Sequence, residues 1–324
     1  MALVAQITQQ GGPEVIEWID KDLPAPGPGE VRMRNTAIGL NFIDTYHRGG
    51  VYPVPLPSGL GVEAAGIVDA VGDGVTGFAP GDRVATFGPV LGSYATERNI
   101  AAAALFKTPD GIADEVAAAA MLKGCTAEFL VERCAKVQPG WTVLVHAAAG
   151  GVGLLLVQWL KHMGARVIGT VGTTEKADLA RAAGADHVII TTEEDTAKAC
   201  RDLTEGKGVP VVFDGVGQDS WDASLRSTAP RGLIVSYGNA SGPVTGVDLR
   251  RLAEAGSIFV TRPTLFHYYA TPEERAAGAA RLFEMLGTGA VTVDIRQRYA
   301  LTDAAQAHRD LEARRTTGSS LLLP

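Results

Sequence analysis

The stretch from His146 to Gly153 constrains this chain more than any other, because small residues there join a strand pattern to a helix pattern. It reads HAAAGGVG, follows the apolar run 142–145 and precedes the apolar run 154–160. Small residues let the backbone approach a pyrophosphate, and the helix start offers free N–H groups and a positive dipole end. A second strand pattern at 166–171 stands where a βαβ unit requires it. The Ala-x-x-Gly-x-x-Gly spacing therefore predicts a dinucleotide-binding turn, with a purely structural tight turn as the alternative.

The pattern after this turn keeps alternating between strand and helix, which is typical of an α/β fold with a doubly wound parallel sheet. We expect strands near 142–146, 166–171, 187–190, 210–214, 232–237 and 257–261, and helices near 152–163, 175–183, 194–204, 219–227 and 248–255. Residues 1–120 read as short strands separated by Gly/Pro turns, and 121–264 as the doubly wound domain. Residues 265–324 have too few apolar positions for a core of their own, so we expect them to return to the first domain.

Composition narrows the classes of function. The chain has 324 residues and a formal net charge of −7, and no cluster of Lys or Arg, which argues against a nucleic-acid surface or an anionic membrane. The three cysteines show no CxxC spacing, which fits a reducing compartment. No signal-peptide pattern and no apolar run long enough to span a bilayer is visible, so we expect a cytoplasmic protein.

Four stretches carry a resemblance to a known family. They are 41–46 (NFIDTY), 61–66 (GVEAAG), 147–153 (AAAGGVG) and 318–320 (GSS). With these the chain resembles the zinc-independent, zeta-crystallin-like quinone oxidoreductases of the medium-chain dehydrogenase/reductase superfamily, over essentially its whole length. The resemblance implies a GroES-like β-rich catalytic domain, split in sequence, and a Rossmann domain. It also implies a homodimer formed edge to edge, and the strand near 256–260 is the expected contact.

The residues argue against a catalytic zinc. Zinc dehydrogenases of this superfamily carry a histidine where Val62 stands and a cysteine in the region now held by 41–44. Valine cannot bind a metal, and a catalytic Zn²⁺ needs three protein ligands. A simple ketone needs such a metal to polarise its oxygen, whereas a quinone or conjugated enone spreads the incoming charge over its π-system. The chain is therefore expected to reduce an electron-poor conjugated carbonyl.

The cofactor expected at the glycine-rich turn is NADPH rather than NADH. The second strand ends in small neutral residues instead of the acid that holds a ribose 2′-OH, and Lys176 follows closely. The resemblance gives Arg314 the second phosphate-binding position and places Thr191 where relatives often have a tyrosine. The strand-end rule and the resemblance together assign these residues to the cofactor: Asn41, Thr126, Gly150, Gly151, Val152, Gly153, Gly172, Lys176, Thr191, Gly215, Val216, Gly217, Gly238, Asn239, Pro263, Thr264, Leu265 and Arg314.

Asn41, Tyr46 and Tyr52 are the expected catalytic residues, in what reads as a loop-rich stretch. The Asn41 amide can donate to a carbonyl or a ribose hydroxyl, and a phenol can donate to a developing oxyanion. Glu63 is expected to be a buried structural carboxylate paired with an arginine. Three functions remain open: an NADPH-dependent quinone reductase, an NADPH-dependent enone or alkenal reductase, and a non-catalytic NADPH-binding protein like the lens crystallins of this family.

Overall fold

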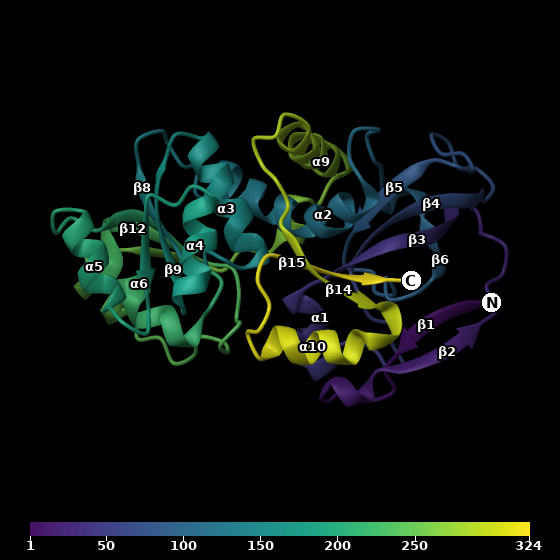
Figure 1. Ribbon diagram of the computed structural model, residues 1–324, viewed down its shortest axis with the longest axis horizontal. Helices are drawn as coiled ribbons and strands as arrows, with labels where there is room; N and C mark the ends of the chain where they lie inside the picture. The colour runs from purple at the N-terminus through teal and green to yellow at the C-terminus, as the bar shows by residue number, and fades with distance from the viewer. The chain divides into compact units, whose positions relative to one another are not determined.

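The computed structural model describes residues 1–324 and divides them into two compact units. Unit 1 contains Met1–Lys123, Thr271–Gly287 and Val293–Pro324, and unit 2 contains Gly124–Ala270 and Thr288–Thr292. Unit 1 is therefore assembled from segments far apart in the sequence (Figure 1).

Unit 2 is built on a six-stranded sheet in the order β10-β9-β8-β11-β12-β13, with every pairing parallel. The strands are β8 (Thr142–Val145), β9 (Arg166–Val171), β10 (His187–Ile190), β11 (Val209–Asp214), β12 (Thr228–Ser236) and β13 (Phe259–Thr261). Numbered from the first strand this order is 3-2-1-4-5-6, the Rossmann arrangement. The predicted doubly wound parallel sheet is confirmed.

Helices flank the sheet of unit 2 (Figure 1). They are α3 (Gly151–His162), α4 (Thr174–Ala182), α5 (Thr196–Leu203), α6 (Trp221–Ser227), α7 (Arg250–Glu254) and α8 (Leu265–Tyr268). Helix α3 packs on α4, and α5 packs on α6. Right-handed crossovers that run to opposite sides of β8, the first strand, require these pairings. The five predicted helices agree with α3 to α7 within a few residues at each end, and α8 was not predicted.

Unit 1 is mostly β. Its seven-stranded sheet has the order β14-β15-β3-β4-β5-β7, with β6 also paired to β3, and a separate antiparallel pair joins β1 and β2. The strands are β1 (Ala2–Gln6), β2 (Glu17–Lys21), β3 (Glu30–Leu40), β4 (Glu63–Val71), β5 (Arg83–Phe87), β6 (Glu97–Ala101), β7 (Leu105–Lys107), β14 (Ile295–Ala300) and β15 (Ser319–Leu323). The C-terminal strand β15 pairs with β3, so the end of the chain returns to the first sheet as expected.

Three helices lie in unit 1, and a fourth, α2, begins there and ends in unit 2; α1 differs from the sequence-based expectation. They are α1 (Phe42–Gly49), α2 (Asp114–Glu128), α9 (Pro272–Gly287) and α10 (Ala304–Glu312). The stretch expected to be loop is helix α1, begun by a capping box between Asn41 and Asp44 and ended by Gly50 at φ 83°. Helix α2 runs to Glu128 and continues into a π-helical turn.

Each unit has its own apolar core. Met33, Ile38 and Leu322 belong to the core of unit 1, and Leu144, Val212 and Ile234 to that of unit 2. Strands of a parallel sheet are buried on both faces, which is why residues 143–145 of β8 and 209–213 of β11 form continuous apolar runs. None of the helices combines the length and apolarity that crossing a bilayer would demand.

Candidate active site

Most of the predicted cofactor residues follow directly on the strands of unit 2. Because all six strands are parallel, their carboxyl ends share one edge of the sheet, which is where ligands of such folds bind. The residues that follow strands β8 to β13, in that order, are Gly150 to Gly153, Gly172, Thr191, Gly215 to Gly217, Gly238 with Asn239, and Pro263 to Leu265. The fold therefore gathers residues from six separate loops at one edge.

The turn between β8 and α3 has the geometry that its sequence predicts. Gly150 is the N-cap of α3, so the first backbone N–H groups of the helix follow it directly. A Cβ on Gly153 would overlap the Ala147 carbonyl oxygen and lie 2.9 Å from Ala148 Cα. Ala147 itself has φ 53°, a left-handed conformation in which an alanine is strained. Only a glycine at 153 lets the helix start this close to the turn.

The corner between β9 and α4 presents a second helix start. Gly172 is exposed after β9, and Thr173 is the N-cap of α4, where its hydroxyl accepts from the backbone N–H of Lys176 at 3.3 Å. Lys176 thus stands in the first helical turn, and no acidic residue ends β9. Thr191 follows β10, is exposed, and donates its backbone N–H to the Val171 carbonyl at 2.8 Å. A phosphate at this corner would meet the positive end of α4 and a lysine.

The loop after β11 is held by the carboxylate of Asp214. Its Oδ1 accepts from the backbone N–H groups of Val216 at 2.9 Å and Gly217 at 3.0 Å. Gly217 has φ 97°, which favours glycine. A Cβ on Gly238 would lie within 2.8 Å of the backbone of Gly215, so the loops after β11 and β12 touch. The N–H groups of Val216 and Gly217 are therefore already hydrogen-bonded within the loop, and a ligand can contact only the other atoms of these residues.

The remaining predicted cofactor residues lie elsewhere in the chain. Thr126 is half-buried in α2, within unit 2. Asn41 and Arg314 belong to unit 1, and Arg314 is exposed after α10 with φ 58°. In unit 2 the Arg262 guanidinium donates to the Ser236 carbonyl at 2.8 Å, which ties the segment after β13 to the end of β12.

In unit 1, Asn41 is engaged more fully than the sequence suggests. Its Nδ2 donates to Glu63 Oε2 at 2.8 Å and to the Gly39 carbonyl at 3.3 Å, and its backbone N–H donates to Asp44 Oδ2 at 2.9 Å. The side chain is 4% exposed. An amide nitrogen has two hydrogens, and both are committed here. Asn41 can therefore serve a ligand only through its oxygen, as an acceptor.

Tyr46 and Tyr52 form one aromatic group. Their ring centroids are 5.3 Å apart at 72°, edge to face, and Tyr52 N–H donates to the Tyr46 carbonyl at 3.1 Å. Phe42 lies 6.1 Å from the Tyr46 ring, and His47 lies 6.1 Å from the Tyr52 ring. Both tyrosines are half-buried. Helix α1 and the turn after it thus bring together two phenols that are six positions apart.

Glu63 is fully buried, as expected, but its cationic partner is a lysine rather than an arginine. Lys123 Nζ lies 3.4 Å from Glu63 Oε2, and the Leu122 N–H donates to Oε1 at 2.6 Å. A Cβ on Gly39 would collide with the same carboxylate, so the glycine makes room for it. Glu63 and its partners anchor the Asn41 amide.

A chain of buried polar groups fastens α1 to α10, which lie side by side in Figure 1. Arg48 donates to His308 Nδ1 at 2.9 Å, His308 Nε2 lies 3.0 Å from the Tyr94 hydroxyl, and that hydroxyl donates to Asp44 Oδ2 at 3.0 Å. Burial, together with the charge of Arg48, lowers the pKa of His308 to about 3. Burial raises the pKa of Asp44 to about 7, although hydrogen bonds from Asn41 and Tyr94 oppose the rise. The second oxygen of Asp44, Oδ1, is buried without a partner.

The donor set does not fit a zinc ion. The structure contains no group of three or more His, Cys, Asp or Glu side chains placed to hold a metal. Val62 is buried beside Glu63, and Glu63 is already bound to Lys123, Leu122 and Asn41. We derive no step through a metal.

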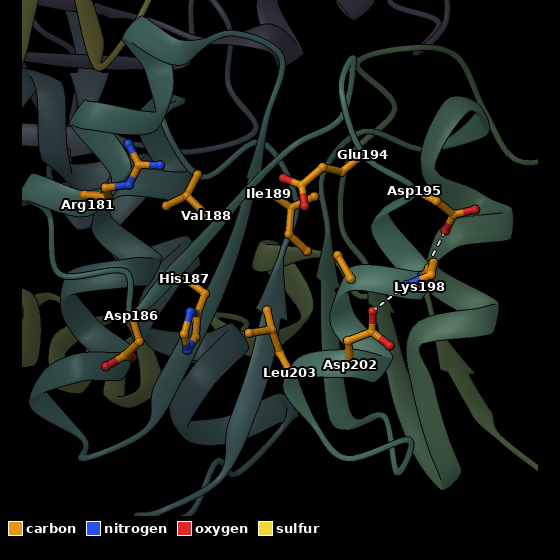
Figure 2. A pocket seen from close by; sticks show the side chains of 11 residues that line it. Arg181, Asp186, His187, Val188, Ile189, Glu194, Asp195, Lys198, Asp202 and Leu203 are labelled. Carbon is orange, nitrogen blue, oxygen red and sulfur yellow. Dashed lines mark hydrogen bonds and ion pairs between the residues drawn. The ribbon is translucent and has the colours of Figure 1, made fainter.

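A groove of about 620 Å³ runs along β10, at the outer edge of the sheet in unit 2 (Figure 2). Helix α5 contributes Lys198 and Asp202, which pair at 2.7 Å, and Asp186 pairs with Lys161 at 2.8 Å. None of the predicted cofactor residues lines it. Lys198, Asp202 and Asp186 are already paired within the protein, so we place the cofactor at the strand ends instead.

Comparison with known proteins agrees with the fold described above. Residues 27–139 match the family described as "Alcohol dehydrogenase GroES-like domain", and residues 151–284 match "Zinc-binding dehydrogenase". The chain is 54% identical to a quinone oxidoreductase of Pseudomonas aeruginosa, with each chain covered completely. It is 45% identical to a 2-haloacrylate reductase of a Burkholderia species, covering 100% of this chain and 99% of the relative.

A solved structure extends the comparison to three dimensions. The crystal structure of the Escherichia coli quinone oxidoreductase complexed with NADPH matches with a TM-score of 0.97 at 47% identity, covering 99% of this chain and 100% of that one. The expected GroES-like and Rossmann architecture is confirmed. With identities of this size over the full length, the chain belongs to the quinone oxidoreductases of the medium-chain dehydrogenase/reductase superfamily.

Proposed function

We propose that this protein is an NADPH-dependent quinone reductase that works without a metal. The observation that carries the proposal is the full-length similarity, 54% and 47% identity, to proteins named quinone oxidoreductase. The glycine-rich turn and the strand ends of unit 2 fit a dinucleotide. When bound, NADPH supplies the reducing equivalents, and the chain's own residues bind it, orient the acceptor and stabilise the charge that develops on it.

We assign the preference for NADPH to two cations. Lys176, in the first turn of α4, and Arg314 are the residues proposed to bind the 2′-phosphate. The neutral end of β9, with Gly172 exposed, supports this assignment because an acid there would repel the phosphate. A charge-assisted hydrogen bond to a phosphate is about twice as strong as a neutral one.

We assign the reacting end to helix α1 and the turn after it. The phenols of Tyr46 and Tyr52 are proposed to donate to the quinone oxygen as negative charge develops there. The oxygen of Asn41 is proposed to accept from a hydroxyl, since its nitrogen is committed to Glu63 and Gly39. A quinone delocalises the incoming charge, so donors of this kind can replace a Lewis acid.

A second candidate function is reduction of another activated double bond. It is supported by the 45% identity to a protein named 2-haloacrylate reductase. Such a substrate is a conjugated alkene and needs the same cofactor but a differently shaped pocket. A third candidate, a non-catalytic NADPH-binding protein, would retain cofactor binding without turnover.

One assay separates the three candidates. NADPH oxidation is followed with 1,4-benzoquinone, a cyclic enone and a 2-haloacrylate, and kcat/KM is compared among the acceptors. A quinone reductase gives its largest kcat/KM with the quinone. A larger value for the enone or the haloacrylate would replace the proposed substrate class, and NADPH binding without oxidation of any acceptor would favour the non-catalytic candidate.

We also propose a homodimer formed along the free edge of β13. This strand is the last of the sheet, and Phe259 and Val260 on it are 64% and 39% exposed. An exposed edge strand with apolar side chains is a site for pairing with another chain, and the second copy is the proposed partner. Light scattering should give twice the chain mass, and Phe259→Lys should shift it toward the monomer. A wild-type monomer at micromolar concentration would contradict the proposal.

A cytoplasmic location is proposed with the function. None of the three cysteines forms a disulfide, and Cys125 and Cys200 are buried. The absence of disulfides fits a reducing compartment. Fractionation of cells that express the protein should recover the activity in the cytoplasmic fraction.

A further inference from the structure

Four buried polar side chains lie beneath the strand ends of unit 2 and touch one another in a row. Thr170 Oγ1 lies 3.0 Å from His146 Nδ1, His146 Nε2 lies 3.0 Å from Ser224 Oγ, and Ser224 Oγ donates to Asp214 Oδ2 at 2.6 Å. Each is at most 2% exposed. The sequence alone did not indicate the contacts of His146.

The number of hydrogens fixes the direction of every bond in this row. The Asp214 carboxylate accepts from Ser224, from the hydroxyl of Ser220 at 2.7 Å, and from two backbone N–H groups. The Ser224 hydroxyl has one hydrogen, which it donates to Asp214. Its oxygen must therefore accept a hydrogen bond from His146 Nε2–H. Burial lowers the pKa of His146, which keeps the ring neutral, so its Nδ1 accepts from the Thr170 hydroxyl.

The row spans the place where the strand order of the sheet reverses. His146 follows β8, Thr170 lies near the end of β9, and Asp214 ends β11. Strands β8 and β11 are neighbours, and crossovers leave them in opposite directions. In folds of this order one mononucleotide binds over the first half, β8 to β10, and the other over the second half, β11 to β13. The row therefore links the two halves directly below the cofactor-binding edge.

We infer that His146 and Ser224 are positioning residues that hold the loops of the two halves in register, so that both ends of NADPH bind at once. The inference rests on the proposed function, because it assumes that NADPH binds at this edge. His146 stands immediately before the glycine-rich turn, and Asp214 fixes the Val216 and Gly217 N–H groups of the opposite loop. Breaking the row removes this side-chain link between the loops, while the backbone pairing of β8 with β11 remains.

The test uses two ligands that differ in how much of the edge they cover. NADPH covers both halves, whereas 2′,5′-ADP carries only the adenosine half with its 2′-phosphate. Ser224→Ala should raise the Kd of NADPH on the order of tenfold, because a buried group loses its partner, and should change the Kd of 2′,5′-ADP less than twofold. The matched control is Ser227→Ala, which removes another fully buried hydroxyl from the same helix, outside the row. It should change neither Kd more than twofold.

Each other outcome has a definite meaning. Equal weakening of both ligands by Ser224→Ala would indicate a general structural role and overturn the inference, as would no weakening of either. A wild-type protein that binds neither ligand would refute the proposed function itself, and the inference with it. Binding by the wild type with unaltered NADPH affinity in Ser224→Ala would refute the inference alone.

A spectroscopic measurement tests the same row without a substitution. The hydrogen inventory requires a neutral His146 with its hydrogen on Nε2, and ¹⁵N NMR of the ring distinguishes the two tautomers. The spectrum should show the Nε2–H form, unchanged between pH 6 and pH 8. A hydrogen on Nδ1, or titration of the ring within that range, would overturn the assigned direction of the bonds.

Discussion

Asp44→Asn should make the protein more stable above neutral pH. Asp44 is fully buried; its Oδ2 accepts from Asn41 N–H and from the Tyr94 hydroxyl, and its Oδ1 has no partner. Burial is the main cause that raises its pKa from 3.8 to about 7. Ionising this carboxyl is therefore much less favourable in the folded chain than in the unfolded chain.

The sign and size follow from linkage. Well below pH 3.8 the carboxyl is protonated in both states and costs nothing. Between pH 4 and 7 only the unfolded state releases the proton, so the stability contributed by this group falls as the pH rises. Above pH 7 the full penalty applies, about 4 kcal/mol at 1.36 kcal/mol per pKa unit. Asparagine has the shape of the protonated acid and does not ionise, so it avoids this penalty.

The measurement is urea unfolding of wild type and variant at each pH from 4 to 8.5. The two proteins are compared at the same pH because His308 has a pH effect of its own. Its pKa is lowered to about 3 in the folded chain, so its contribution to stability grows as the pH rises to 6.5, whereas that of Asp44 falls. The variant should match the wild type near pH 4 and exceed its free energy of unfolding by several kcal/mol at pH 8. The control is Asp73→Asn at an exposed carboxylate, which should leave the pH profile unchanged. A variant less stable than the wild type at pH 8 would refute the reasoning.

Three further substitutions test the site. Lys176→Ala should raise the Kd of NADPH about 10- to 100-fold and barely change that of NADH, as fluorescence titration would show; equal losses would mean that Lys176 does not read the 2′-phosphate. Tyr52→Phe should lower kcat about tenfold and leave the Kd of NADPH unchanged. If Tyr52→Phe, Tyr46→Phe and the double variant all keep the wild-type kcat with several quinones, the two hydroxyls have no catalytic role. Gly153→Ala should weaken NADPH binding at least tenfold because its Cβ would collide with the backbone of the preceding turn, and wild-type affinity would contradict the assigned turn geometry.

The sequence predicted the strands of unit 2 well because their burial leaves a plain pattern. Strands β8 and β11 are apolar except for Thr142 at the start of β8 and Asp214 at the end of β11, and a small-residue turn marks where β8 passes into α3. Helix α1 was missed because its capping box uses Asn41 and Asp44 instead of the more familiar Ser or Thr with Glu. The pattern Asn-x-x-Asp followed by Gly50 could have indicated it.

The side-chain partners in the site could not be predicted from the sequence. Lys123 pairs with Glu63, which lies sixty positions earlier in the sequence. The sequence does not show that α2 lies beside β4, so an arginine was an equally plausible partner. His146, Ser224 and Asp214 meet only because β8 and β11 are neighbours in the sheet. Contacts of this kind depend on tertiary packing, which no local pattern encodes.

The central claim is that the protein transfers reducing equivalents from NADPH to a quinone without a metal. The most direct test is anaerobic NADPH oxidation with 1,4-benzoquinone, using protein dialysed against a chelator and analysed for zinc. The account predicts quinone-dependent oxidation with one NADPH consumed per quinone reduced to hydroquinone, far less than one zinc per chain, and no loss of rate after chelation. Absence of quinone-dependent oxidation, or a rate that is lost with the chelator and restored by zinc, would contradict it.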